Sequence, residues 1–279
     1  MKRAGVAGDP IAHSLSPVLH RAAYADLGVD LSYDLLPTPQ EKLDELLDSL
    51  DASWAGISLT MPHKQAVIPR LDMVDGLAKT VGAVNTVCVQ PTGNMLVGFN
   101  TDVAGIVSAV REVSPEPVSS CLILGGRATA SSTLAAAVEL GTRNLTIAAR
   151  NHGGPGSALT AATRMNLSPE LMRFDPDTIA ARAERSSLLV STVPAGVADR
   201  VAEELAARQP DLSHLTVLDV VYEPWPSRLT AVAGELGARI VPGWLMLVHQ
   251  AARQVRLFTG RMPRVEVMKR ALEEELARR

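Results

Sequence analysis

The sequence has little cysteine, no excess of positive charge and no long apolar run. Its two cysteines, Cys88 and Cys121, lie in apolar stretches without a CxxC pair or a Cys/His spacing typical of metal ligands. They are therefore predicted to be buried reduced thiols, and no metal site is expected. No apolar run approaches the roughly 18 residues of a membrane span, and the first residues lead into strand-like sequence without a signal-type core. A cytoplasmic protein is predicted.

The charge of the chain is nearly balanced. The formal net charge is -3, and the arginines are scattered rather than clustered. This distribution predicts neither a nucleic-acid surface nor a polybasic membrane patch, so the expected partner is a small molecule. The composition is that of a globular protein, with 47% hydrophobic residues, and 279 residues are enough for two domains of roughly 100–200 residues each.

Strand-like and helix-like periods alternate along the first hundred residues, as in βαβ units. Strands are predicted at 3–8, 31–36 and 54–60, helices at 16–27 and 40–50, and a hairpin at 84–90 and 95–99. After a helix from Asp102 to about Arg111, a second series of strands is predicted at 121–124, 144–149, 188–192, 216–221 and 238–241. Two helical stretches, 245–259 and 265–277, end the chain without a further strand. The pattern predicts two α/β domains with a boundary near residues 101–117, and the last helices are expected to return to the first domain.

A glycine turn marks a candidate nucleotide site. The apolar strand at 121–124 leads into Gly125 and Gly126, and an alanine-rich helix follows. Such a turn brings a pyrophosphate close to free N–H groups at the helix N-terminus. Read as GxGxxG, the motif has Arg127 at its second glycine position. Arg127 could donate to a phosphate or push the pyrophosphate outward, and a plain βα turn without ligand is the alternative. The predicted cofactor-binding residues of this turn are Gly125, Gly126, Arg127, Ala128, Thr129 and Ala130.

The end of the next strand indicates which dinucleotide is bound. Enzymes that use NAD usually have an acidic residue there for the ribose hydroxyl, whereas those that use NADP have a cation for the 2′-phosphate. This chain has Arg150 and Asn151 at that point, and no Asp or Glu competes with them. The predicted cofactor is therefore NADP.

The first domain contains the candidate chemistry. Hydroxyl and amide side chains dominate, and such groups can bind the hydroxyls of a polyhydroxylated carboxylate one by one. Each also has a structural alternative: Ser16 as a helix N-cap, Thr60 in a turn and Asn85 as a hairpin brace. Lys64 and Asp102 differ, because a lysine beside a carboxylate can exchange a proton with a hydroxyl or carbonyl.

Several ordered motifs resemble those of one known family. They are Gly8-Asp9-Pro10-Ile11-Ala12-His13-Ser14-Leu15-Ser16-Pro17, Thr60-Met61-Pro62-His63-Lys64, Gly82-Ala83-Val84-Asn85-Thr86, Asn100-Thr101-Asp102, Ser191-Thr192-Val193-Pro194, Asp219-Val220-Val221-Tyr222 and the run from Gly243 to Ala252. In wording and order they are similar to the signatures of shikimate dehydrogenase. The resemblance implies reversible NADPH-dependent reduction of 3-dehydroshikimate to shikimate in aromatic amino acid biosynthesis. It also implies an N-terminal α/β substrate-binding domain (1–103, with 247–279 returning to it), a Rossmann-type NADP-binding domain (104–246), and a monomer or homodimer.

The resemblance also assigns roles to residues. Ser14 and Ser16 would hold the substrate carboxylate, and Lys64 would transfer the hydroxyl proton while hydride passes between nicotinamide C4 and ring C3. The implied contacts to the ring and its surroundings are Asn85, Asp102 and Gln250, with Ser58, Thr60 and Tyr222. The implied contacts to the cofactor, beyond the glycine turn and Arg150, are Thr192, Val193, Val220 and Gly243.

The chain departs from the family pattern at several positions. Ser58 stands where the family usually has Asn, Arg127 interrupts the usual glycine-rich turn, and only Arg150 remains of the second phosphate motif. Leu245 also replaces a small residue. Two alternatives therefore stay open: a quinate/shikimate dehydrogenase that uses NAD, and a non-catalytic, shikimate-binding relative in which Arg127 has spoiled the cofactor turn.

Overall fold

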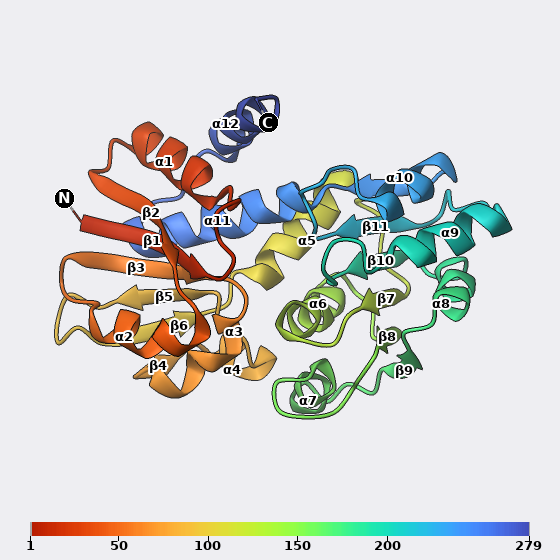
Figure 1. Ribbon diagram of the computed structural model, residues 1–279, viewed down its shortest axis with the longest axis horizontal. Helices are drawn as coiled ribbons and strands as arrows, with labels where there is room; N and C mark the ends of the chain where they lie inside the picture. Colours follow the sequence, from red (N-terminus) through yellow and green to blue (C-terminus); the bar gives the residue numbers. More distant parts are fainter. Residues whose placement is uncertain (1, 279) are drawn as a thin grey trace. The chain divides into compact units, whose positions relative to one another are not determined.

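The computed structural model describes residues 2–278 and has an α/β architecture with two sheets (Figure 1). The chain divides into two compact units. The described part of the first unit comprises residues 2–105 and 247–278, and the second unit comprises residues 106–246. The predicted fold class is confirmed.

The first unit contains a mixed sheet with the strand order β2-β1-β3-β5-β6-β4. Its strands are β1 Lys2–Gly8, β2 Leu31–Pro37, β3 Trp54–Leu59, β4 Met73–Val74, β5 Thr86–Val89 and β6 Leu96–Phe99. Strands β2, β1 and β3 are parallel, whereas β5 runs antiparallel to both β3 and β6. The shorter helices of this unit are η1 Gln40–Lys42, α2 Leu43–Asp48, α3 His63–Ala66, η2 Ile68–Arg70 and α4 Gly76–Val81.

The strand register brings several chain segments together at one end of the strands, where β1, β3 and β6 finish and β5 begins. We call this end the sheet edge. Ser58 near the end of β3 pairs with Thr86 at the start of β5, and Thr86 pairs with Phe99 at the end of β6. The residues after β3, before β5 and after β6 therefore share one edge. The carboxyl end of β1 lies there too, because β1 and β3 are parallel. This edge is where the candidate chemistry of the first unit gathers.

The chain returns to the first unit after the second, as predicted. Helix α11 spans Gly243–Thr259, and its residues from Leu247 onward belong to the first unit. Helix α12, Val265–Leu276, packs beside α1, Ser16–Leu27 (Figure 1). Arg264 Nε donates to Asp26 Oδ2 at 2.9 Å, and Arg261 Nη1 donates to the Leu27 carbonyl at 2.7 Å. These contacts fasten the connection before α12 to the end of α1.

The second unit contains a fully parallel sheet with the order β12-β11-β10-β7-β8-β9. Its strands are β7 Cys121–Leu124, β8 Leu145–Ala149, β9 Glu170–Arg173, β10 Leu188–Ser191, β11 Thr216–Asp219 and β12 Arg239–Val241. Its helices are α6 Ala128–Glu139, α7 Ala158–Arg164, α8 Pro176–Ala183, α9 Asp199–Arg208 and α10 Arg228–Glu235, with α5 Asp102–Val113 leading in from the first unit. Figure 1 shows α6 and α7 on one side of the strands and α8, α9 and α10 on the other. The strand order reverses between β7 and β10, the Rossmann arrangement in which ligands bind at the carboxyl ends of these strands.

The sequence pattern missed two strands, the two-residue β4 and β9, and misplaced several element ends. Strand β9 was not predicted, because its side chains are largely exposed, Leu171 included at 43%, and it shows no apolar run. The stretch predicted as one helix at 40–50 is a 3-10 turn followed by α2. Most predicted strands extend one or two residues beyond the observed ones. Such ends depend on tertiary hydrogen bonds, which local apolar patterns do not record.

Both cysteines are buried, as predicted, in the cores of their units. Burial raises the pKa of the Cys88 and Cys121 thiols to about 12, so neither is a reactive thiolate near neutral pH. No helix within residues 2–278 combines the length and apolarity needed to cross a bilayer.

His20 lies in a buried aromatic cluster of the first unit. Its ring stacks on Tyr33 with centroids 3.8 Å apart, and Nδ1 donates to the Ser16 carbonyl at 3.0 Å. The side chain is fully buried, and Nε2 has no hydrogen-bond partner among residues 2–278. Desolvation by burial lowers the pKa of His20 from 6.5 to about 3, against the opposing effect of the Ser16 hydrogen bond. The folded protein therefore keeps this imidazole neutral.

This burial predicts an acid-sensitive stability. Between pH 6.5 and about 3 the unfolded chain binds a proton at His20 that the folded chain does not. As the pH is lowered through this window, His20 alone should reduce the free energy of unfolding by about 1.4 kcal/mol per pH unit. We expect the free energy of unfolding of His20→Asn to decline less steeply with falling pH than that of wild type. Urea unfolding at several pH values would measure both slopes. Comparison at pH 8, where both forms bind equal protons at this position, corrects for altered packing; equal slopes below pH 6.5 would contradict the prediction.

Candidate active site

Lys64 and Asp102 form an ion pair at the edge of the first sheet. Lys64 lies in α3, just after β3, and Asp102 begins α5, just after β6. Lys64 Nζ donates to Asp102 Oδ2 at 2.7 Å, with side-chain exposures of 16% for the lysine and 3% for the aspartate. The sequence alone did not show that these residues meet. The carboxylate is buried, whereas part of the lysine side chain remains open to a small molecule.

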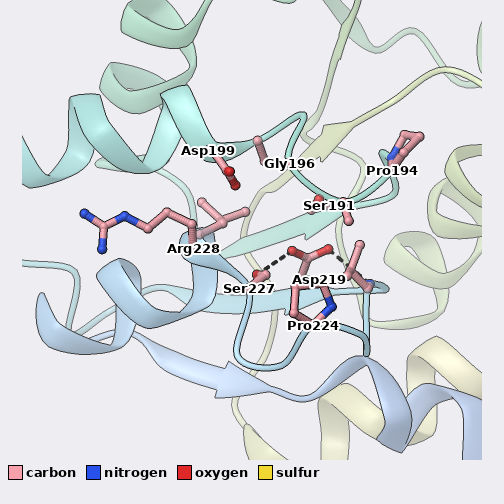
Figure 2. A pocket seen from close by; sticks show the side chains of 12 residues that line it. Ser191, Pro194, Gly196, Asp199, Asp219, Pro224, Ser227 and Arg228 are labelled. Carbon is pink, nitrogen blue, oxygen red and sulfur yellow. Dashed lines mark hydrogen bonds between the residues drawn. The ribbon is translucent and has the colours of Figure 1, made fainter.

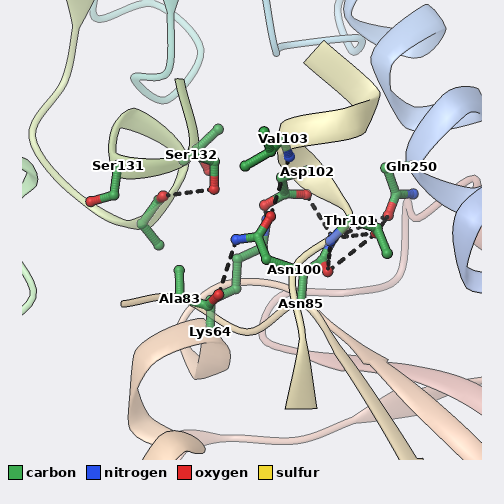
Figure 3. A network of polar contacts seen from close by, with 12 residues as sticks. Lys64, Ala83, Asn85, Asn100, Thr101, Asp102, Val103, Ser131, Ser132 and Gln250 are labelled. Atoms are coloured by element: carbon green, nitrogen blue, oxygen red, sulfur yellow. Dashed lines mark hydrogen bonds and ion pairs between the residues drawn. The ribbon is translucent and has the colours of Figure 1, made fainter. Parts of the chain in front are cut away.

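Asn85 is the centre of a polar network around this pair (Figure 3). Its Nδ2 donates to Asp102 Oδ1 at 2.7 Å and to Thr101 Oγ1 at 2.9 Å, and lies 3.3 Å from Gln250 Oε1. Its Oδ1 accepts the Thr101 backbone N–H at 2.8 Å. The Asp102 carboxylate thus accepts from both an ammonium and an amide, and such charge-assisted hydrogen bonds are the stronger kind.

Ser14, Ser16 and Thr60 follow strands that end at the same edge. Ser14 and Ser16 lie between β1 and the first turn of α1, where Leu15, not Ser16, is the N-cap residue and Pro17 follows at N2. Ser16 is therefore not the capping side chain. Ser14 Oγ accepts the Ser16 backbone N–H at 3.3 Å. Thr60 N donates to the Ala7 carbonyl at 3.0 Å, which ties the segment after β3 to β1.

Ser58 is buried beneath this edge and has two side-chain partners. Tyr33 Oη donates to Ser58 Oγ at 2.7 Å, and Ser58 Oγ donates to Gln254 Oε1 at 2.9 Å. The hydroxyl has a single proton. Ser58 therefore donates within the protein, and only its acceptor capacity is left for another group.

Sequence reasoning missed Tyr33 and Gln254 as members of this network. One signal was available for Gln254: it lies four residues after Gln250 in α11, and residues at that spacing share a helix face. Gln250 Nε2 donates to the Leu247 carbonyl at 2.9 Å, which directs its Oε1 to Asn85. For Tyr33, nothing in the sequence separates it from an ordinary core residue of a strand.

Tyr222 belongs to the second unit, in the loop that follows β11. A buried carboxylate holds this loop: Asp219 Oδ2 accepts from Ser227 Oγ at 2.7 Å, and Oδ1 accepts the Val221 N–H at 3.2 Å (Figure 2). Burial raises the pKa of Asp219, and its hydrogen bonds to Ser227 and Val221 oppose that shift. A cavity of about 270 Å³ lies beside these residues. Asp219 thereby orders the segment that carries Val220 and Tyr222.

Two glycines allow close backbone approach in the second unit. Gly125 follows β7 with φ +117°, and a Cβ there would lie 2.2 Å from Thr192 Oγ1. Thr192 itself donates through Oγ1 to the Leu124 carbonyl at 2.8 Å, so this threonine braces the turn. A Cβ at Gly243 would lie 2.4 Å from the Asp219 carbonyl oxygen. Only glycine fits at either position.

A cavity of about 210 Å³ lies along the glycine turn, at the carboxyl ends of β7 and β8. Its lining includes Gly125, Gly126, Arg127, Arg150, Asn151, Thr192 and Val193. Helix α6 begins beside it, with Ala128, Thr129 and Ala130 in the first turn. Arg127 is the N-cap residue of this helix, and its guanidinium is 3.4 Å from the Pro155 carbonyl, to which it donates. The arrangement offers glycine backbone, a helix N-terminus and two cations to an anion.

Comparison with known proteins gives two family matches. The model for the shikimate dehydrogenase substrate binding domain matches residues 6–87, and the model for the shikimate 5'-dehydrogenase C-terminal domain matches residues 243–273. The first match covers the edge segments from β1 to β5, and the second covers α11 with most of α12.

Similar proteins extend the match over nearly the whole chain. A shikimate dehydrogenase (NADP(+)) from Methanosarcina barkeri is 34% identical over 275 residues, which cover 98% of each sequence. The Thermus thermophilus shikimate 5-dehydrogenase in complex with NADP(H) and shikimate has a TM-score of 0.81 and 31% identity, with 98% of this chain and 99% of that chain covered. A quinate dehydrogenase from Corynebacterium glutamicum in complex with NAD has a TM-score of 0.82 and 26% identity, with coverage of 98% and 99%. The sequence and the architecture of the present chain together show that it belongs to the shikimate dehydrogenase family.

Proposed function

We propose that this protein catalyses the reversible, NADPH-dependent reduction of 3-dehydroshikimate to shikimate. The observation that carries the proposal is the Lys64–Asp102 pair, buried on the carboxylate side and surrounded by amide and hydroxyl groups at one sheet edge. Family membership supports the reaction, since the relatives named shikimate dehydrogenase (NADP(+)) match along the whole chain. In this proposal the first unit binds the substrate and the second binds the cofactor.

The residues of the second unit fit NADP. The Gly125 position excludes a side chain and leaves the backbone at the turn accessible to a pyrophosphate. Arg150, which lines the cavity, offers the cation that a 2′-phosphate needs, and among the described residues no acidic side chain lines that cavity to favour NAD. The set Gly125, Gly126, Arg127, Ala128, Thr129, Ala130, Arg150, Asn151, Thr192 and Val193 would hold the dinucleotide, with Val220 and Gly243 beside the nicotinamide. Bound NADP supplies the hydride chemistry, between nicotinamide C4 and ring C3 of the substrate.

The first unit supplies the groups that would hold the substrate. Ser14 and Ser16, at the start of α1, are suited to its carboxylate, because a helix N-terminus adds N–H groups and a favourable dipole. In this proposal Asn85, Asp102 and Gln250 exchange hydrogen bonds with ring hydroxyls, and Thr60 is a further contact. Ser58 contributes as an acceptor only, since its proton goes to Gln254.

Lys64 and Asp102 divide the work of proton transfer. In the direction of reduction, Lys64 Nζ donates a proton to the oxygen at C3 as that oxygen gains negative charge. Asp102 holds Nζ through the 2.7 Å contact and balances its charge. Because Asn85 also donates to Asp102, the carboxylate cannot turn away from the lysine without losing a hydrogen bond. The pair is therefore pre-positioned, which lowers the cost of reaching the reactive geometry.

Initial rates of shikimate oxidation, followed at the reduced-nicotinamide absorbance, test this proposal. We expect activity with shikimate and NADP. Activity should be much lower when NAD replaces NADP or when quinate replaces shikimate. Activity chiefly with quinate and NAD would make the protein a quinate/shikimate dehydrogenase instead. Shikimate binding without turnover or NADPH binding would indicate a non-catalytic relative in which Arg127 blocks the cofactor turn.

Cellular location and assembly also belong to this proposal. We propose a cytoplasmic protein that acts on small molecules as a monomer or homodimer, in keeping with the sequence-based expectation. Size-exclusion chromatography with light scattering would measure the assembly directly.

A further inference from the structure

Tyr33, Ser58 and Gln254 form a buried hydrogen-bond chain beneath the sheet edge of the first unit. They come from β2, β3 and α11, and their exposures are 0%, 3% and 2%. Tyr33 donates to Ser58 at 2.7 Å, Ser58 donates to Gln254 Oε1 at 2.9 Å, and Gln254 Nε2 donates to Thr86 Oγ1 at 3.0 Å and to the Asn85 carbonyl at 3.2 Å. The chain is thus continuous from Tyr33 to the residue at the centre of the polar network.

The chemistry of these groups allows one direction of donation. The backbone carbonyl of Asn85 can only accept a hydrogen bond. The nitrogen of the Gln254 side-chain amide must therefore face this carbonyl, and the amide oxygen must face Ser58. Ser58 then gives its one proton to Gln254, which leaves it able only to accept from Tyr33. The phenol of Tyr33 therefore donates to Ser58.

The same direction continues to the ion pair. Thr86 Oγ1 accepts from Gln254 and donates to Asn85 Oδ1 at 2.9 Å. Asn85 Oδ1 also accepts the Thr101 backbone N–H, so Asn85 presents Nδ2 to Asp102 Oδ1. The series of hydrogen bonds that begins at Tyr33 therefore ends at the Asp102 carboxylate, which also accepts from Lys64. Buried networks of this kind fix one orientation of every member, provided that all partners are present.

We propose that Tyr33 is a positioning residue for substrate binding, because its hydroxyl donates to Ser58 Oγ and, together with Gln254, fixes the orientation of that side chain. This inference rests on the proposed function. Without the phenol hydroxyl, Ser58 loses the donor that Tyr33 provides, and its hydroxyl keeps the hydrogen bond to Gln254. Groups that line the substrate site then become less ordered before binding, and shikimate must order them at the expense of affinity.

The test is Tyr33→Phe in the full-length protein, which removes only the hydroxyl and keeps the ring that stacks on His20. We expect the KM for shikimate to rise about tenfold while kcat changes by less than about threefold, because the Lys64–Asp102 contact stays in place. The KM for NADP should stay at the wild-type value. A residue with a purely structural role would lower the melting temperature without this selective effect on shikimate.

Tyr24→Phe is the matched control. Tyr24 lies in the same aromatic cluster and is 2% exposed, but its hydroxyl has no hydrogen-bond partner in the part of the chain that the structure describes. It should therefore show wild-type kinetics. An unchanged KM for shikimate in Tyr33→Phe, or an equal rise in Tyr24→Phe, would overturn the inference.

The dissociation constant for shikimate, measured by calorimetry on the same three proteins, separates this inference from the proposed function. If wild type binds shikimate without oxidising it, the proposed reaction fails and the tenfold weakening expected for Tyr33→Phe is still measured. Equal affinities for wild type and Tyr33→Phe would then overturn the positioning role. If wild type neither binds nor oxidises shikimate, both proposals fail.

Discussion

Replacement of Lys64 by alanine is expected to lower kcat for shikimate oxidation by about 10²–10⁴-fold, the scale of general acid–base catalysis. The reason is that Nζ is the cationic group paired with Asp102 at 2.7 Å, and the proposed mechanism gives it the hydroxyl proton. Shikimate binding should largely persist, since the hydroxyl and amide groups of the edge remain. Steady-state kinetics and the calorimetric dissociation constant would measure the two effects separately.

Lys79→Ala provides the control for this loss of charge. Lys79 is an exposed lysine in α4 of the same unit, and we expect its removal to leave kcat at the wild-type value. Near-normal turnover in Lys64→Ala would remove the lysine from the mechanism. A loss of shikimate binding as large as the loss of kcat would instead make Lys64 a binding residue.

Replacement of Arg150 by alanine is expected to raise the KM for NADP by about 10–100-fold, because a charge-assisted contact to the 2′-phosphate is lost. The KM for NAD should change by less than about threefold, because NAD has no phosphate at that position. Arg150 directly follows β8 and lines the cavity beside the glycine turn, which supports its place in the cofactor site. Initial rates with both cofactors over a range of concentrations would give the two KM values.

Arg143→Ala is the matched control for the cofactor experiment. Arg143 is also exposed, but it precedes β8 and so lies at the opposite end of the same strand. Its loss should leave both KM values unchanged. A parallel rise in the KM for NADP and for NAD in Arg150→Ala would show that the arginine does not distinguish the two cofactors.

Local signals in the sequence were strong enough to predict most of the fold. The alternation of apolar periods predicted two α/β units, and the run from Cys121 through Gly126 predicted the first βα turn of the parallel sheet. Gly125 illustrates why such a signal is reliable: its φ of +117° and its 2.2 Å approach to Thr192 leave room only for glycine. Strand β9 was missed for the opposite reason, because an edge strand with mostly exposed side chains has no apolar pattern to read.

The site was predicted in part by residue type and motif. Ser14, Thr60, Lys64, Asn85 and Asp102 were named as candidates for the chemistry of their side chains and for the motifs in which they lie. Their roles remain predictions, but the structure shows which of them meet. Tyr33 and Gln254 were not named, since a tyrosine in a buried strand and a glutamine in a helix are ordinary in those elements. Ser58 and Gln254 are hydrogen-bonded although 196 positions separate them in the chain.

The sequence by itself determined the elements, the glycine turn with Arg150 after the next strand, and the stock of groups available for chemistry. These depend on properties of single residues and their near neighbours: apolar periodicity, backbone freedom and charge. Only the tertiary structure decided that Lys64 meets Asp102, 38 positions later, and that Tyr33 is connected to Asn85 through Ser58 and Gln254. The physical reason is the sheet register, since antiparallel β5 and β6 bring residues from distant parts of the chain to the edge where β3 ends.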